Sequence, residues 1–494
     1  MTGLDPQPRP LDHLLISKAG IVLRTRDEAL SYAEADGAVA RLAAAMAHLP
    51  TGSRVATWLP KTVEACLMPL AAARAGLVHV PINPVLKRAQ VAHILHDSDA
   101  SLLLTADARL SSLLEEDLPR GCAVWREEEA REARSARAEG LPPSKRHPSE
   151  LVALLYTSGS TGRPKGVMLT HSNLWLGAVS VAHYLGLASD DVTLAMLPLG
   201  FDYGQNQLLS TWYAGGTVVP FDYLLPRDVA RVVAQEGITT LAAVPPLWTQ
   251  LVELDWGSSG EEVRRVTNSG GALTPRLIGA LRVAFPRADI FPMYGLTEAF
   301  RSTFLPSELV ATHPTSIGRA IPFAEILVVD EEGQPAEQGE LVHAGPLVAQ
   351  GYWRDFARTA ERFRPAPQHS SYGGTAVWSG DRVSRDANGL LYFEGREDEM
   401  IKTSGHRVSP TDIEEVALAS GLVREAVAHA VSDERLGQAI RLVVSGPGDE
   451  AALLTYLKRE LPSFMLPRDI SWRAELPRNA NGKLDRSAIR AEAL

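Results

Sequence analysis

The sequence contains few cysteines and no excess of basic side chains. Cys66 and Cys122 are its only cysteines and lie far apart, outside any CxxC spacing. This excludes a disulfide framework and a cysteine-rich zinc site, and it fits a reducing compartment, so we expect a cytoplasmic protein. Lysine and arginine number 49 against 59 acidic residues, and the net charge of −10 disfavours a general nucleic-acid binder.

Long apolar runs are missing as well. Glu64 and Arg74 interrupt the apolar stretch around residues 67–70, so no segment predicts a transmembrane helix. The N-terminus lacks a basic start followed by an apolar run, and we expect no secretory signal. With 494 residues, 45% of them hydrophobic and 22% charged, the composition is typical of a globular protein of at least two domains.

The order of periodic segments predicts an α/β protein. Helix-like stretches at 32–49 and 64–75 alternate with short apolar strands at 54–58 and 78–81, and the same rhythm returns between 102 and 244. The mixed charge run 126–137 is interpreted as a solvated helix. Short strands and turns after residue 316 predict a β-rich subdomain. We therefore predict a large N-terminal domain, 1–397, of α/β subdomains plus this β-rich subdomain, and a small α+β C-terminal domain, 398–494.

A glycine-rich segment, residues 157–166, follows an apolar strand. Its glycines and hydroxyls allow backbone N–H groups to meet an oxyanion, and Lys165 adds a positive charge. The segment therefore predicts a phosphate-binding loop, with a flexible surface loop as the alternative. A Walker-type site is disfavoured because Gly166, rather than serine or threonine, follows the lysine.

Five further motifs follow this loop along the chain. They are YGLTE at 294–298, WSGD at 378–381, GRED at 395–398, KTSGHR at 402–407 and PRNANGK at 477–483. Together with the loop, they resemble the ordered motifs of the AMP-forming adenylating enzymes, the superfamily of acyl-CoA synthetases, peptide-synthetase adenylation domains and luciferases. Each motif alone is weak, but agreement in order and spacing over most of the chain is specific.

The resemblance implies an ATP-dependent ligase that joins a carboxylate to AMP and then passes the acyl group to a thiol. Both reactants of the first step are anions, so cations must offset their repulsion. The implied cations are Lys483, Arg407, Lys165 and Mg²⁺. Lys483 would span the substrate carboxylate and the ribose–phosphate junction, and Lys165 would hold the departing pyrophosphate. The alternative for Lys483 is a solvated lysine in a tail.

The same resemblance implies a nucleotide site. Glu298 would hold Mg²⁺, Thr297 would contact the α-phosphate, and Asp381 with Arg396 would bind the ribose. The alternatives are that Thr297 caps a helix and that Asp381 is a turn residue. The remaining nucleotide-binding residues implied are Thr157, Ser158, Gly159, Ser160, Thr161, Gly162 and Tyr294.

The implied small domain is mobile. Asp398 would be its hinge, and rotation would withdraw the lysine and bring Gly405 to the thiol channel, so that one site runs both half-reactions.

The expected acyl pocket contains an acidic residue. It is built from Phe201, Asp202, Gly270, Gly271 and Met293. The Phe201-Asp202 pair resembles that of amino-acid-activating domains, whose aspartate binds the substrate ammonium. A buried carboxylate needs a cationic or hydrogen-bonding partner, which an amino-acid-like substrate supplies. The alternative is that Asp202 caps a helix beginning near residue 205.

No carrier domain follows the last motif within the sequence, so the expected acceptor is CoA or a separate phosphopantetheinylated acyl or peptidyl carrier protein. The predicted substrate is a small carboxylic acid, with a weak preference for an amino-acid-like one. The competing interpretations are an acyl-CoA synthetase for a neutral medium-chain or aromatic acid and a non-catalytic nucleotide-binding sensor.

Overall fold

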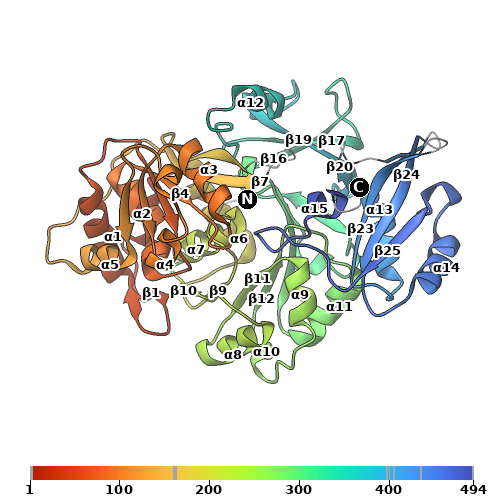
Figure 1. Cartoon of the computed structure of the whole chain (residues 1–494), viewed down its shortest axis with the longest axis horizontal. Coiled ribbons are helices and arrows are strands. Elements are labelled where there is room, and N and C mark those ends of the chain that lie inside the picture. The colour runs from red at the N-terminus through yellow and green to blue at the C-terminus, as the bar shows by residue number, and fades with distance from the viewer. Residues whose placement is uncertain are drawn as a thin grey trace.

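The computed structural model describes residues 4–158, 164–396, 399, 401–403, 406–433 and 437–491. Within these residues the strands form three sheets, shown in Figure 1. The predicted α/β class is confirmed, with a large N-terminal part followed by a small α+β part. In the same residues, no helix is both long enough and apolar enough to cross a membrane.

The first sheet has six strands in the order β6-β5-β3-β4-β7-β8. All neighbours run parallel except β7 and β8, which form an antiparallel hairpin. Its strands are β3 (Arg54–Trp58), β4 (Val78–Pro81), β5 (Ala100–Thr105), β6 (Ala123–Arg126), β7 (Leu151–Ser158) and β8 (Pro164–Thr170). The helices of this region are α1 (Tyr32–Met46), α2 (Val63–Ala75), α3 (Arg88–Ser98), α4 (Asp107–Leu110) and α5 (Glu127–Ser135).

The second sheet changes from parallel to antiparallel along its width. Strands β10, β9, β11, β12 and β13 run parallel, as the apolar runs before residue 300 predict. These strands are β9 (Val192–Ala195), β10 (Thr217–Pro220), β11 (Thr240–Ala243), β12 (Arg265–Asn268) and β13 (Asp289–Tyr294), and beyond β10 the sheet ends in β1 (Ile21–Arg24) and β2 (Ala29–Ser31). The helices along this stretch are α6 (His171–Leu185), α7 (Asp202–Ala214), α8 (Pro226–Glu236), α9 (Pro245–Leu251), α10 (Ser259–Glu262) and α11 (Pro275–Ala284).

From β13 onward every pairing is antiparallel, through β14, β15, β20, β19, β17 and β16. This is the β-rich region expected after residue 316. Its elements are β14 (Thr303–Phe304), β15 (Ser316–Ala320), β16 (Glu325–Val329), β17 (Gln338–Ala344), α12 (Phe356–Arg362), β18 (Phe363–Pro365), β19 (Thr375–Arg385) and β20 (Leu391–Arg396).

The third sheet belongs to the C-terminal part and has an apolar core of its own. Strands β22, β21, β24 and β23 are antiparallel neighbours, and β25 runs parallel to β24. The elements are β21 (Ile401–Thr403), β22 (His406–Val408), α13 (Pro410–Ala419), β23 (Glu425–Asp433), β24 (Gly437–Ser445), α14 (Glu450–Glu460), β25 (Asp469–Arg473) and α15 (Arg486–Ala491).

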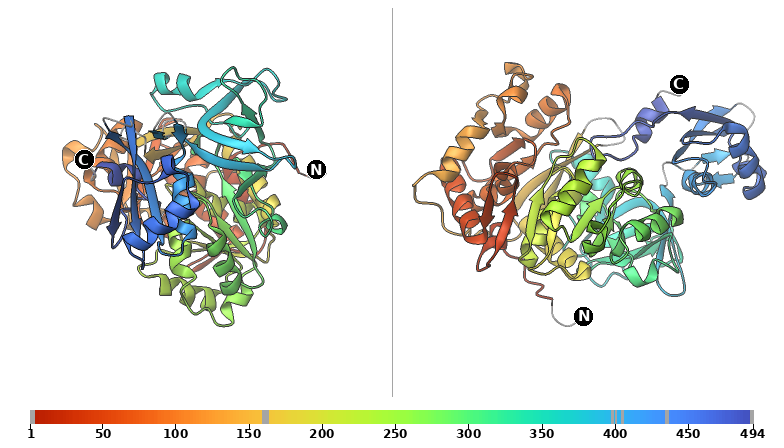
Figure 2. Two further views of the ribbon diagram at one scale, coloured as in Figure 1. Left: turned by 90° about the vertical axis from the view of Figure 1, so that its right-hand side faces the viewer. Right: turned by 90° about the horizontal axis from the view of Figure 1, so that it is seen from below.

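The loop between β25 and α15 leaves the C-terminal part and returns to the larger one. In Figure 1 this dark blue loop runs from α15 towards β11 and α9, and Figure 2 shows the C-terminal part standing beside the rest of the molecule. Residues 479–482 line a cavity together with Val244 and Leu247. The fold thus carries a segment from near the end of the chain to the carboxyl end of a central parallel strand, where sites in open α/β sheets form.

The mixed charge run is helical, but it is less solvated than the sequence predicts. Helix α5 buries Ala130 completely and Arg134 almost completely. The Arg134 guanidinium lies 2.9 Å from a Glu28 carboxylate oxygen and 3.1 Å from one of Glu64. Because a buried guanidinium requires acidic partners from other segments, the alternating charges of the helix alone do not reveal this contact.

Candidate active site

Lys483 is carried by a tight turn in the loop after β25. The Asn479 N–H donates to the Lys483 carbonyl at 2.8 Å, and the Asn479 side-chain oxygen accepts from the Lys483 N–H at 3.1 Å. Gly482 has a φ of 78°, which glycine adopts without strain. The PRNANGK motif is therefore a turn that fixes the direction of the lysine.

The Lys483 side chain enters the expected acyl pocket. Its Nζ lies 4.5 Å from the centre of the Phe201 ring. A Cβ placed on Gly270 would lie 2.3 Å from the lysine Cε, so the aliphatic stem passes directly over this glycine. Burial lowers the pKa of Lys483, while the Asp202 carboxylate opposes this shift. The alternative of a solvated tail lysine is wrong.

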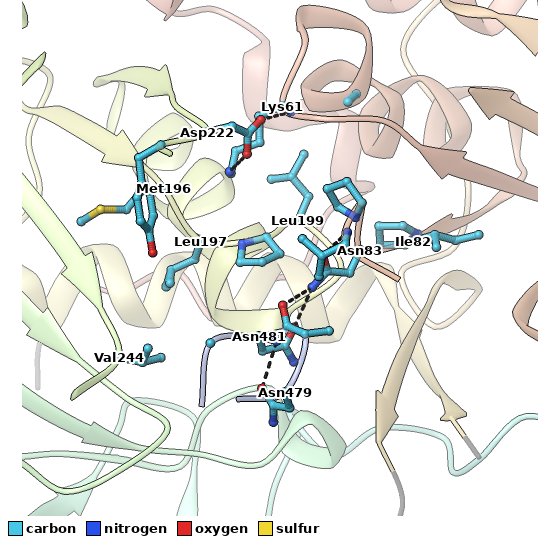
Figure 3. A pocket seen from close by; sticks show the side chains of 18 of the residues that line it. Lys61, Ile82, Asn83, Met196, Leu197, Leu199, Asp222, Val244, Asn479 and Asn481 are labelled. Carbon is cyan, nitrogen blue, oxygen red and sulfur yellow. Dashed lines mark hydrogen bonds and ion pairs between the residues drawn. The ribbon is translucent and has the colours of Figure 1, made fainter. Parts of the chain in front are cut away.

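Asn83 holds the turn that carries the lysine. Asn83 follows β4, and its Nδ2 donates to the Ala480 carbonyl at 2.7 Å and to the Asn481 Oδ1 at 3.1 Å. Figure 3 shows these contacts at the edge of a cavity of about 370 Å³, whose far side carries the Lys61–Asp222 ion pair. Asn83 lies in a Pro-Ile-Asn-Pro segment, residues 81–84, that resembles the one in acyl-CoA synthetases, but no motif in the sequence places it next to the lysine turn.

Asp202 is buried and already has a basic neighbour. It is the first residue of α7 and makes no capping hydrogen bond, so the interpretation as a cap of a helix beginning near residue 205 is wrong. Its carboxylate is 4% exposed and lies 3.5 Å from the Arg301 guanidinium. The cationic partner that a buried Asp202 is expected to need is therefore present within the chain itself, and a substrate ammonium is not required to supply it. Arg301 comes shortly after the YGLTE motif, and this position was its only signal.

Gly271 and Met293 also line this region. A Cβ on Gly271 would lie 3.1 Å from the Pro245 ring, and the Met293 sulfur accepts a hydrogen bond from the Tyr184 hydroxyl. Of the five predicted pocket residues, Phe201 and Gly270 lie directly against the Lys483 side chain, and Asp202 is close enough to affect its pKa.

Lys165, Glu298 and Tyr352 form a second polar group. The Lys165 Nζ donates to the Tyr352 hydroxyl at 2.7 Å, that hydroxyl donates to the Glu298 carboxylate at 2.6 Å, and the lysine lies 3.4 Å from the same carboxylate. Burial lowers the pKa of Lys165, and Glu298 opposes the shift. Sequence reasoning missed Tyr352, which lies in a Gly-Tyr-Trp segment that belongs to none of the motifs considered.

This group borders a polar cavity of about 770 Å³ that also contains Asp381. Thr297 begins a short 3-10 turn (Thr297–Ala299) whose N-cap is Leu296, so the alternative of a helix cap made by the threonine is wrong. Within the described residues, no group of three histidine, cysteine or acidic side chains gathers to hold a metal. A single carboxylate still suits Mg²⁺, because this ion is commonly held by one or two carboxylates plus substrate phosphates.

Asp381, Tyr294 and Arg396 form a third group, where β13, β19 and β20 meet. The Tyr294 hydroxyl donates to an Asp381 carboxylate oxygen, and the other oxygen lies 3.5 Å from the Arg396 guanidinium. Burial raises the pKa of Tyr294, and the Asp381 carboxylate adds to the shift. Asp381 lies within a strand paired with Arg396, so the alternative of a plain turn residue is wrong.

The glycine-rich segment joins β7 to β8. Thr157 pairs with Lys165 in this hairpin, and its hydroxyl has no hydrogen-bond partner among the described residues. Ser158 ends β7 and Arg407 lies in β22. Six predicted site residues lie outside the described part of the chain, namely Gly159, Ser160, Thr161, Gly162, Asp398 and Gly405.

Comparisons with known proteins agree with this arrangement. The family described as AMP-binding enzyme matches residues 14–353, and the AMP-binding enzyme C-terminal domain matches residues 412–483. The chain is 30% identical to feruloyl-CoA synthase from an Amycolatopsis species over 97% of both chains. It is also 28% identical to tyrocidine synthase 3 from Brevibacillus parabrevis, over 94% of this chain but only 7% of that relative.

A solved structure resembles the whole chain. The crystal structure of ATP-bound MatB from Rhodopseudomonas palustris has a TM-score of 0.89 and 25% identity, and the match covers 98% of this chain and 99% of that one. Both the large part and the C-terminal part thus have counterparts in one solved protein.

Proposed function

The chain belongs to the AMP-binding enzyme family and is an AMP-forming acid–thiol ligase, and from this premise we propose the substrate and the roles of its residues. The substrate is a small carboxylic acid, with an amino-acid-like acid preferred. In the first step a carboxylate oxygen attacks the α-phosphorus of ATP, and the bond to pyrophosphate breaks. In the second step a thiol attacks the acyl carbon, and AMP leaves.

The position of Lys483 is the observation that carries this proposal. A lysine from the far end of the chain is held between Phe201 and Gly270, within the electrostatic reach of Asp202. In a partly desolvated site, a cation at this point offsets the repulsion between a carboxylate and a phosphate, and removal of such a group costs about 10²- to 10³-fold in rate.

The other two groups would together form the nucleotide site. Asp381 with Tyr294 and Arg396 would bind the ribose, and the segment 157–162 with Lys165 would hold the phosphates. Thr297 would contact the α-phosphate. Glu298 would hold Mg²⁺, which when bound neutralises phosphate charge.

The second half-reaction requires Lys483 to move out of the acyl pocket. We propose a boundary at residues 397/398, with Asp398 as the hinge and Gly405 in the thiol channel. The loop 479–482 forms one wall of the 370 Å³ cavity, so its withdrawal would open a route for a pantetheine arm. The acceptor is CoA or a separate carrier protein. The relative named feruloyl-CoA synthase supports CoA as the acceptor. The relative named tyrocidine synthase 3 supports a carrier protein.

The competing functions have less support. A neutral medium-chain or aromatic acid would meet the charged side chains of Asp202 and Arg301 in the pocket, and burying an apolar group against them is unfavourable. A non-catalytic sensor would not need a lysine in contact with the acyl pocket. The cytoplasmic location and the absence of a nucleic-acid partner stay predictions from composition.

ATP–pyrophosphate exchange tests the proposal. Purified protein with Mg²⁺ is assayed against a panel of amino acids, their des-amino analogues, and alkyl and aryl acids. We expect acid-dependent exchange and release of AMP with at least one small acid. Failure with every acid, or formation of ADP, would contradict the proposed function.

A further inference from the structure

Arg301 occupies an unusual place for an arginine, the interior of the acyl pocket. Its side chain is 2% exposed. The preceding residue, Phe300, has a φ of 58°, a strained conformation for a non-glycine residue. The Phe300 ring packs so closely on α6 that a Cβ at Gly177 would lie 2.3 Å from it. This packing holds the strained backbone and turns Arg301 inward.

Within the protein, only some of the N–H donors of the Arg301 guanidinium have a partner. Nη1 lies 3.5 Å from the Asp202 carboxylate, and the guanidinium stacks 4.6 Å from the centre of the Tyr203 ring. Nε and Nη2 are buried and have no hydrogen-bond acceptor among the described residues. A buried donor that is left unpaired destabilises the folded protein. Two such donors on one side chain are available to an acceptor that a ligand brings into the site.

The space beside Arg301 is small, and most of its lining surface is apolar, with Val181, Leu185 and Leu187 on one side. The adjoining cavity measures about 20 Å³ and is bordered by Tyr203, Asn206, Thr240 and Met293. This is room for about one water molecule. The Asn206 side-chain oxygen and the Thr240 hydroxyl also lack partners within the described structure. The small volume and the unpartnered atoms of Arg301, Asn206 and Thr240 therefore suit a small group with oxygen atoms better than a long alkyl chain or an aromatic ring.

The charges divide along the pocket. Lys483 is partly exposed and would face the reacting carboxylate, while Asp202 and Arg301 are buried as a pair of opposite charge. Because this pair is internally neutral, a substrate needs no formal charge beyond its carboxylate to enter. It must instead provide an acceptor for the free donors of Arg301.

We propose that Arg301 is the specificity-determining residue of this enzyme. It selects a short carboxylic acid that carries an oxygen acceptor, such as a hydroxyl, keto or second carboxyl group, and it discriminates against alkyl and aryl acids. Asp202 orients the guanidinium and accepts a hydrogen bond from a substrate hydroxyl or ammonium. This inference rests on the proposed function and narrows its substrate class.

The test is a comparison of matched acids in ATP–pyrophosphate exchange. Lactate, pyruvate, malonate and serine are compared with propionate, butyrate and benzoate, for wild type, Arg301→Met and Arg301→Lys. Sites built to hydrogen-bond a substrate group strongly reject analogues that lack it. We expect wild type to prefer an oxygen-bearing acid by about 100-fold or more in kcat/KM, Arg301→Met to lose this preference, and Arg301→Lys to retain part of it.

Arg134→Met is the matched control, because Arg134 is another buried, ion-paired arginine outside this site. It should leave the preference between acids unchanged even where it lowers stability. A wild-type preference for alkyl or aryl acids would overturn the assignment without any variant, as would an unchanged ratio in Arg301→Met. Both outcomes leave the ligase function standing, whereas exchange with no acid at all would remove both proposals.

Discussion

At the level of single residues, the chemistry of the site depends on where one lysine lies. Lys483 is partly desolvated, and burial lowers its pKa, while Asp202 favours its charged form. The amine must be protonated to stabilise a carboxylate beside a phosphate. Its stem passes directly over Gly270, so a side chain at that position would displace the lysine.

Gly270→Ala tests this placement. The new methyl group would collide with the Lys483 stem, so adenylation should fall by about 10²- to 10³-fold, as in Lys483→Ala. Thioester formation from supplied adenylate should be largely retained in both variants. Stopped-time product analysis of each half-reaction measures the two effects.

Gly389→Ala serves as the control for backbone strain. Gly389 has a φ of 80°, close to the 82° of Gly270, but a Cβ there would meet nothing within 4 Å. The Gly389→Ala variant should therefore retain its adenylation rate. Equal loss of both half-reactions in Gly270→Ala would contradict the lysine placement.

At the level of secondary-structure elements, a turn and a strand end hold the two parts of the chain together. The side chain of Asn83, after β4, donates to the turn that precedes Lys483. Two hydrogen bonds of about 1 kcal/mol each are enough to favour one orientation by about tenfold or more. These hydrogen bonds thereby hold the turn in the orientation that directs Lys483 into the acyl pocket.

Asn83→Ala should therefore lower adenylation about tenfold and leave thioester formation from supplied adenylate unchanged. Asn481→Ala removes one of the two contacts but keeps the bond to the Ala480 carbonyl, so its effect should be smaller. Single-turnover measurements of each half-reaction give the comparison. A uniform loss in both half-reactions would instead assign Asn83 a role in stability alone.

At the level of the whole molecule, four histidines are buried in the described structure, namely His79, His171, His343 and His429. Burial lowers the pKa of His79 and His343 to about 3 and that of His171 and His429 to about 4. The His171 ring nitrogen Nδ1 accepts a hydrogen bond from the Leu11 N–H, which requires the neutral ring. His171 therefore has a structural role, because it binds the backbone of the N-terminal segment.

Stability should consequently fall on mild acidification. In the unfolded chain these histidines titrate near pH 6.5. Below that pH the unfolded state therefore binds more protons than the folded state, in which the buried rings stay neutral. Each buried histidine then lowers the free energy of unfolding by up to about 1.4 kcal/mol per pH unit between about 6.5 and 4. Thermal midpoints at pH 7, 6 and 5 measure the trend.

The matched variants are His171→Asn and His369→Gln. Removal of the buried histidine should make the pH dependence shallower, whereas removal of the exposed His369 should not change it. Identical pH profiles for wild type and His171→Asn would refute the linkage.

Much of this fold follows from local sequence. Strands β3 and β4 and helices α1 and α2 occur where the apolar periods predict them, because alternation and helical spacing are properties of neighbouring residues. The ordered motifs likewise point to the carboxylates and lysines proposed for the nucleotide site, because each motif is contiguous in the chain.

The reaction class and the inventory of charged groups can be inferred from the chain alone, since both are carried by short contiguous motifs. Which of those groups meet depends on the folded structure. Asp202 and Arg301 are separated by 98 intervening residues, and Asn83 and Ala480 by 396, so no local pattern links them. Long-range contacts are set by how sheets and loops pack, and packing depends on the whole chain at once.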